Sequence, residues 1–147
     1  MTQSAQPSFT PVSDTRHDLG LHGRELILDA RKIGVNFRVE GGTVNAVRDV
    51  SFQLHKGETI ALVGESGSGK SVTARTLMKL LTKRATILPE TQITLSGQNI
   101  VTMSDKDMRK LRGNDIAMIF QEPMSSLNPV YTVGQQICEI IHLHNRM

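Results

Sequence analysis

Gly64-Glu65-Ser66-Gly67-Ser68-Gly69-Lys70-Ser71 has the spacing GxxxxGK[ST], which is the phosphate-binding P-loop pattern. Glycines in such a loop allow backbone angles that turn successive N–H groups inward, where they surround phosphate oxygens. Lys70 supplies a cation for the β- and γ-phosphates, and Ser71 supplies a hydroxyl for Mg²⁺. The alternative is an ordinary glycine- and serine-rich turn between a strand and a helix.

The flanks of this loop favour the phosphate-binding interpretation. Thr59–Val63 is a short, mostly apolar run, typical of a strand that is buried on both faces. Ser71–Leu81 has the apolar spacing of a helix. The apolar side of that helix is expected to consist of Val72, Ala74, Leu77, Met78 and Leu81. A strand, a loop and a helix in this order predict a site for a nucleoside triphosphate, although kinases, GTPases and motors share the motif.

Strand and helix signals continue on both sides of the loop. Leu26–Val39 predicts one or two strands, Gly41-Gly42 predicts a turn, and Val50–His55 alternates like a strand with one buried face. The other expected elements are a hairpin around Ser96-Gly97, a short helix capped by Ser104 and ending at Gly113, a buried strand over Ile116–Phe120, and a helix from near Thr132 with Val133, Ile137, Ile140 and Ile141 on one face.

The composition excludes several other classes of protein. The 147 residues carry a net charge of +3 and only 3% aromatic residues, which argues against a base-stacking platform for single-stranded nucleic acid. Cys138 is the single cysteine, so there is no intramolecular disulfide or cysteine zinc site, and we expect it to be a small buried side chain. No apolar run reaches the roughly 20 residues that cross a bilayer.

The basic residues are expected to lie on solvated helix faces rather than in a nucleic-acid site, because no recognition motif accompanies them. They are Lys79, Lys83, Arg84, Lys106, Arg109, Lys110 and Arg112. Residues 1–24 are poor in large apolar side chains and are expected to form a disordered N-terminal tail. Residues 25–147 are then the globular part.

Two motifs, in this order, resemble the ATP-binding subunits of ABC transporters. Leu62–Thr73 resembles the P-loop of that family, and Ile119–Pro129 looks like its Q-loop. The residues of this second segment resemble those of the oligopeptide, dipeptide and nickel importer branch. Val50–Phe52 followed by Lys56–Glu58 also matches the approach to the P-loop strand. The resemblance runs from about Glu25 to the C-terminus. It implies an α/β fold, with a P-loop NTPase core and an antiparallel β-subdomain, that stops within the helical subdomain.

The resemblance also implies roles for individual residues. Phe37 looks like the aromatic that stacks on adenine. The alternative that Phe37 is a core residue of a strand is nearly as well supported. Gln121 would contact Mg²⁺ and the attacking water and couple the site to the membrane subunits; its alternative is a polar residue that closes a strand. ATP and Mg²⁺ are the implied cofactors, and the residues expected to bind them are Phe37, Gly64, Ser66, Gly67, Ser68, Gly69, Lys70, Ser71, Val72 and Gln121.

Other motifs of the family are not found in the chain. No apolar run is followed by the Asp-Glu pair that phosphoryl transfer needs in this family. Leu95–Asn99 resembles the signature LSGGQ, but it lacks a glycine and precedes the Q-loop, so we expect a hairpin there instead. His142 and His144 are expected to be surface residues rather than the family's switch histidine. We expect marginal stability and exposed apolar surface, because buried parallel strands need neighbours.

Three functional hypotheses follow. The first is the ATP-binding, energy-coupling subunit of an importer for peptides or related solutes, at the cytoplasmic face of the inner membrane. Its partners would be membrane subunits, through the Q-loop region, and a second ATP-binding subunit. On this hypothesis the chain alone binds ATP without turnover, and the residues do not separate peptide from nickel as the solute. The second is a non-catalytic module that binds ATP or docks on a transporter. The third, an unrelated P-loop enzyme such as a small-molecule kinase, is disfavoured by Phe120–Pro123.

Overall fold

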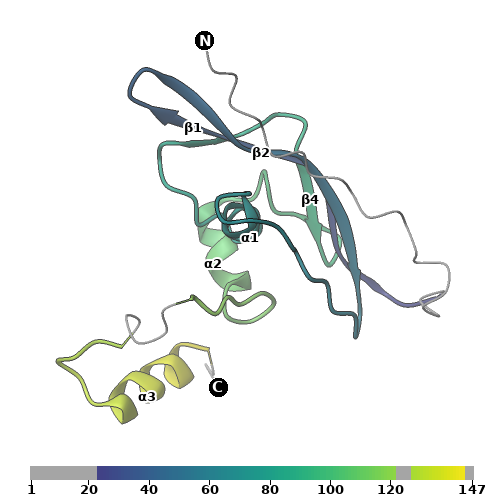
Figure 1. Ribbon diagram of the computed structural model, residues 1–147. Coiled ribbons are helices and arrows are strands. Elements are labelled where there is room, and N and C mark those ends of the chain that lie inside the picture. Colours follow the sequence, from purple (N-terminus) through teal and green to yellow (C-terminus); the bar gives the residue numbers. More distant parts are fainter. Residues whose placement is uncertain (1–22, 122–126, 145–147) are drawn as a thin grey trace. The chain divides into compact units, whose positions relative to one another are not determined.

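The computed structural model describes residues 23–121 and 127–144 (Figure 1). The chain divides into two compact units, Met1–Met103 and Ser104–Met147. The first unit contains a β-sheet and the helix α1 (Lys70–Leu77), and the second contains α2 (Asp105–Leu111) and α3 (Val133–His144). Residues 1–22 of the expected tail lie outside the described residues.

A long antiparallel hairpin forms the frame of the first unit (Figure 1). Its strands are β1 (Leu26–Val39) and β2 (Gly42–His55), with Val39 paired to Gly42 at the turn and Leu26 paired to His55 at the far end. Gly41, between the strands, has a φ of 85°, which favours glycine. The sequence predicted β1 and the turn correctly, but β2 begins eight residues earlier than the predicted strand.

Three short strands complete an antiparallel sheet on the other edge of β1. They are β3 (Ala85–Ile87), β4 (Gln92–Leu95) and β5 (Gln98–Asn99). The sheet order is β2-β1-β4-β5, and β3 pairs with the second half of β1. The buried apolar side chains of this unit are Leu28, Ala30, Ile33, Val35, Val47, Met78, Ile93, Leu95 and Ile100.

β1 pairs with β4 in its first half and with β3 in its second half, and between them the buried Thr91 bonds its backbone in place of a strand. Its hydroxyl accepts a hydrogen bond from the Gly34 N–H at 3.0 Å and donates to the Lys32 carbonyl at 3.1 Å. Gly34 is also tightly covered, since an added Cβ would lie 2.6 Å from Leu88 Cδ1. Thr91 therefore satisfies backbone groups that the ladder leaves unpaired.

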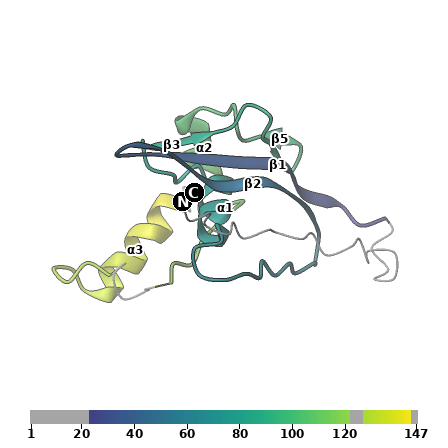
Figure 2. The ribbon, with the colours of Figure 1, turned by 45° about the horizontal axis from the view of Figure 1, so that its top comes forward.

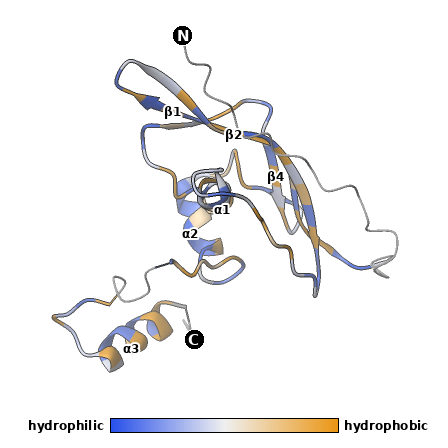
Figure 3. Cartoon of the chain, viewed as in Figure 1, coloured by the Kyte–Doolittle hydropathy of each residue, from blue (hydrophilic) through white to orange (hydrophobic). Residues whose placement is uncertain are grey.

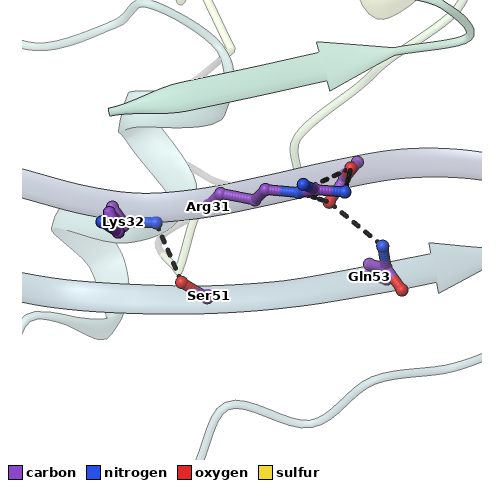
Figure 4. Close-up of polar contacts among 5 residues, drawn as sticks. Arg31, Lys32, Ser51 and Gln53 are labelled. Carbon is purple, nitrogen blue, oxygen red and sulfur yellow. Dashed lines mark hydrogen bonds and ion pairs between the residues drawn. The ribbon is translucent and has the colours of Figure 1, made fainter. Parts of the chain in front are cut away.

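Polar contacts fix the β1–β2 register beside this point (Figure 4). Lys32, with a φ of 50°, donates its backbone N–H to Ser51 Oγ at 2.8 Å, within an irregular stretch of the ladder. Asp29 accepts hydrogen bonds from Arg31 at 3.0 Å and from Gln53 at 3.3 Å. The hydrogen bond from Arg31 is the main reason why the pKa of Asp29 lies below its ordinary value.

The Ser96-Gly97 hairpin predicted from the sequence is confirmed. Leu95 pairs with Gln98, and the two turn residues have φ angles of 45° and 80°. Two positive φ angles in a two-residue loop define a type I′ turn, which suits the twist of the flanking strands. Leu95 is buried as a strand residue, so the segment that resembles the family signature is a hairpin here.

The helix α1 is shorter than the predicted 71–81. The Lys79 N–H donates to the Thr76 carbonyl at 3.0 Å, and the Leu80 N–H donates to the Arg75 carbonyl at 2.9 Å. This is the Schellman pattern, with Lys79 in the left-handed position (φ 50°) that glycine usually occupies. The Lys79 ammonium also donates to the carbonyls of Val101 and Met103, which helps to hold this unusual helix end.

Two predicted strands are wrong for the described residues. Thr59–Val63 and Ile116–Phe120 carry no strand assignment, and Val63 and Ile119 are 81% and 95% exposed. An apolar run becomes a parallel strand only through hydrogen bonds to a neighbouring strand. The single parallel bridge outside the described strands joins Arg112 to Ile116. The exposed apolar surface expected from the sequence is present at these two segments.

The helices of the second unit begin where the sequence predicted. Ser104 caps α2 by accepting the Asp107 N–H at 3.2 Å. Thr132 and Gln135 form a reciprocal cap on α3, with bonds of 3.0 and 3.3 Å between each backbone N–H and the other side chain. Apolar residues recur along α3 (Figure 3), but they are exposed rather than buried. Cys138 is also exposed, so the expectation of a buried thiol is wrong.

Candidate functional site

The P-loop residues 64–69 lie immediately before α1 and in contact with β2. Gly67 and Gly69 have φ angles of 80° and 95°, which L side chains rarely adopt. A Cβ on Gly69 would lie 2.5 Å from the Ala46 carbonyl oxygen and 3.2 Å from Val47 Cγ2. A Cβ on Gly64 would lie 2.6 Å from Ser68 Oγ. Close approach to the backbone thus requires glycine at position 69, and the backbone angle favours glycine at position 67, whereas a Cβ on Gly64 would meet a side chain that can rotate away.

The Lys70 side chain folds back into this loop. Its ammonium donates to the carbonyls of Gly64 and Glu65, both at 2.7 Å, and contacts Ser68 Oγ at 3.3 Å. The loop therefore curves around a positive charge, at the position from which a lysine contacts bound phosphates. The predicted loop residues Ser66 and Ser68 are exposed beside it.

The N-terminus of α1 adds a second positive element to the same place. Its N-cap is Gly69, which has no side chain to bond the first-turn N–H groups, and its first turn contains no acidic residue. The partial positive charge at a helix N-terminus attracts anions. Ser71 is exposed and Val72 half-buried in this first turn, so the hydroxyl of Ser71 is accessible to a bound ion.

Phe37 lies on the face of the sheet that meets the P-loop. Val47, whose side chain comes closest to Gly69, pairs with Val35, and Phe37 follows Val35 by two residues on the same strand. Paired residues and alternate residues of a strand share one face. Phe37 is half-buried, pairs with Val44 and Ala85, and is followed on this face by Val39. The structure thus places the predicted aromatic on the same face as the P-loop.

A bulge in β2 makes this arrangement, and sequence reasoning missed it. Val35 pairs with Val47 but Asn36 pairs with Asn45, so Ala46 is the extra residue of the bulge. The Ala46 carbonyl is the atom that a side chain on Gly69 would strike. No local pattern around Ala46 predicts a bulge. Val39 and Val44 lie beside Phe37 on this face and are 45% and 52% exposed.

Gln121 belongs to the other unit and is exposed at the end of Ile116–Phe120. The next residues of the predicted Q-loop, 122–126, lie outside the described residues. The role of Gln121 therefore stays a prediction. Among the described residues, no group of three or more His, Cys, Asp or Glu side chains could hold a metal ion. Within the same residues, no helix has the length and apolar character to span a membrane.

A glycine loop around a lysine ammonium, at a helix N-terminus and on the same sheet face as an aromatic, defines a P-loop nucleotide-binding domain. Comparison with protein families is consistent with this class. The ABC transporter family model matches residues 47–147, which is more than half of the chain. The chain belongs to the ABC transporter family, and the α/β fold class with its antiparallel β-subdomain is thereby confirmed.

Curated relatives in this family have related names. The chain is 48% identical over 122 residues to a dipeptide transport ATP-binding protein, DppD, of Lactococcus lactis subsp. cremoris, covering 83% of this chain and 35% of that protein. It is 45% identical to the oligopeptide transport ATP-binding protein OppD of Bacillus subtilis, covering 82% and 34%. It is 50% identical to the glutathione import ATP-binding protein GsiA of Salmonella choleraesuis, covering 82% and 20%. The chain thus spans about a third or less of these relatives.

Proposed function

We propose that this chain is the ATP-binding, energy-coupling part of an importer for peptides or related solutes. The observation that carries the proposal is the geometry of the P-loop, in which Gly64–Gly69 curves around the Lys70 ammonium. The names of the relatives support the class of solute, since they refer to dipeptides, oligopeptides and glutathione. Membership of the ABC transporter family supports a nucleotide as the ligand.

The residues of the loop fit ATP. Gly67 and Gly69 take φ angles of 80° and 95°, which let backbone N–H groups turn inward as a cradle for phosphate requires. Lys70 would contact the β- and γ-phosphates, and the Ser71 hydroxyl would bind Mg²⁺. Bound Mg²⁺ would neutralise charge on the phosphates during transfer. Phe37 would stack on adenine, supported by its position on the P-loop face of β1.

Gln121 would contact Mg²⁺ and the attacking water and pass the state of the nucleotide to the membrane subunits. Hydrolysis would also need a carboxylate near the metal, which in this family lies downstream of the Q-loop. It would normally need a second ATP-binding subunit as well, across a head-to-tail ATP sandwich. The complex would lie at the cytoplasmic face of the inner membrane. We expect this chain alone to bind ATP without hydrolysing it.

Titration with a fluorescent ATP analogue and Mg²⁺ tests this proposal. Lys70→Ala should abolish saturable binding, while Lys83→Ala, an exposed lysine outside the loop, should not change the affinity. Phe37→Ala should weaken binding about tenfold, and Phe37→Trp should restore it, since stacking contributes about 1–3 kcal/mol. Equal affinity in the Lys70→Ala and unmodified chains would exclude the P-loop as the site.

A further inference from the structure

The β1–β2 hairpin, whose strands run side by side in Figure 2, contains two further irregularities close together. The pair Ile33–Val50 separates them. Before Ile33, β1 carries one residue more than β2, and Lys32 in that stretch has a φ of 50°. After Ile33, β2 carries one residue more than β1, and Asp49 in that stretch has a φ of 46°. Bulges of this kind re-aim the side chains that they carry.

The backbone angles of Lys32 and Asp49 are unusual for their surroundings. Among the described residues, the other non-glycine positions with a positive φ are Lys79, at the end of a helix, and Ser96, in a hairpin turn. Helix ends and hairpin turns are the usual places for such angles. Lys32 and Asp49 lie inside strands instead, and strained backbone of this kind gathers at ligand sites.

A pocket with a volume of about 240 Å³ opens beside these two residues. It is lined by Lys32, Gly34, Asp49 and Glu90. Glu90 belongs to the turn 88–91, which the hydrogen bond from the Gly34 N–H to Thr91 Oγ1 fixes against β1. The pocket is smaller than the about 300–1,000 Å³ that is typical for drug-sized ligands, so its size suits a molecule no larger than an amino acid.

This pocket is separate from the P-loop. Successive residues of a strand face opposite sides of the sheet. Val35 pairs with Val47 on the face that meets the P-loop, so Gly34 faces the other side, where a Cβ would meet the side chain of Leu88. A ligand in the pocket would therefore not occupy the place proposed for the nucleotide.

The charged groups that line the pocket are not paired with one another. Lys32, Asp49 and Glu90 are exposed, and within the part of the chain that the structure describes their side chains form no ion pair or hydrogen bond. Opposite charges that share a pocket without pairing leave room between them for a ligand that carries both charges. The Lys32 ammonium disfavours a bare metal ion here, and the two carboxylates disfavour a phosphate.

We propose that this pocket is a second ligand site, for a basic amino acid such as free lysine. Lysine carries two ammonium groups and one carboxylate, which is the charge complement of Asp49, Glu90 and Lys32. The ammonium groups of the ligand would contact the Asp49 and Glu90 carboxylates, and its carboxylate would contact the Lys32 ammonium. The site does not depend on the proposed function, because it shares no residue with the P-loop.

A nuclear magnetic resonance titration of the full chain with three compounds tests this inference. L-lysine carries all three charges, cadaverine is the same molecule without the carboxylate, and aminocaproate is lysine without the α-ammonium. Lysine should shift the backbone amide signals of residues 32–34, 49 and 90 in a saturable way. Each analogue should bind about fivefold more weakly, as expected for the loss of one partly solvated charge contact.

Variants that remove one charge at a time identify the contacts. Asp49→Asn keeps the side-chain shape, and asparagine tolerates the left-handed backbone. Asp49→Asn and Glu90→Gln should each weaken lysine binding about fivefold. In Lys32→Asn, lysine and cadaverine should bind equally well, because the partner of the carboxylate is gone. Glu40→Gln, at an exposed carboxylate of the same hairpin outside the pocket, is the matched control and should leave the affinity unchanged.

Three results would overturn the inference. They are the absence of a saturable shift with lysine, equal affinity of the unmodified chain for lysine and cadaverine, and full affinity for lysine in both Asp49→Asn and Glu90→Gln. The comparison of lysine with its two analogues decides alone if circular dichroism shows that a variant has lost structure. Failure to bind MgATP in a chain that binds lysine would count against the proposed function and not against this site.

Discussion

Gly69 should be the least replaceable glycine of the P-loop. Its φ of 95° costs an L-residue about 1–2 kcal/mol. In Gly69→Ala the new Cβ would also lie 2.5 Å from the Ala46 carbonyl oxygen, which is backbone and cannot rotate away. Overpacking of this kind costs about 1–3 kcal/mol. We therefore expect Gly69→Ala to lower the free energy of unfolding, or to weaken MgATP binding, by about 2–5 kcal/mol.

Gly67→Ala is the matched comparison. Gly67 has a φ of 80°, but no atom lies within 4 Å of a Cβ added there. Its replacement should cost only the backbone term, about 1–2 kcal/mol. Urea unfolding followed by circular dichroism, together with a MgATP titration, measures both variants. The two costs should differ clearly in at least one assay. Equal costs in both assays would show that the contact between Gly69 and the bulge at Ala46 has no energetic weight.

Three further predictions concern stability. Thr91→Val should lower the free energy of unfolding by about 1–3 kcal/mol in urea, because it leaves the Gly34 N–H and the Lys32 carbonyl without the buried hydroxyl, whereas Thr91→Ser should recover most of the loss. Ile119→Asn should change that free energy by less than about 0.5 kcal/mol, since Ile119 is almost fully exposed; a larger loss would mean that the segment is buried in solution. The hydrogen bond from the Ser104 hydroxyl, and secondly that from Lys110, hold the pKa of Asp107 below its ordinary value. The Asp107 carboxylate therefore stabilises α2 above a pH of about 3.9, and this stabilisation is lost as the pH falls through the lowered pKa. Acid titration of helix content should show that loss and should show less of it in Ser104→Ala; identical curves would refute the role of this bond.

Signals that act within a few residues predicted their structures well. Ser96-Gly97 supplies the positive φ angles of its turn, and Ser104 and Thr132 supply the caps at which their helices begin. The chemistry of each of these sites is complete within the segment that forms it. The P-loop is similar, because its glycines, its lysine and the start of its helix are adjacent in sequence.

Signals that depend on distant partners did not predict the structure. Thr59–Val63 and Ile116–Phe120 are apolar enough for buried strands, but a strand exists only where another strand pairs with it. The early end of α1 depends on Lys79, whose ammonium finds carbonyls more than twenty residues away. The candidate site shows the same limit, because the bulge at Ala46 sets the position of the P-loop against β2.

Hydrogen exchange of the full chain with and without MgATP tests the central claim most directly. The account predicts slower exchange of the backbone amides of residues 64–72, smaller protection around Phe37, and loss of both effects in Lys70→Ala. The contradicting result is unchanged exchange at residues 64–72 while MgATP binds and protects another place, such as the pocket lined by Lys32, Gly34, Asp49 and Glu90.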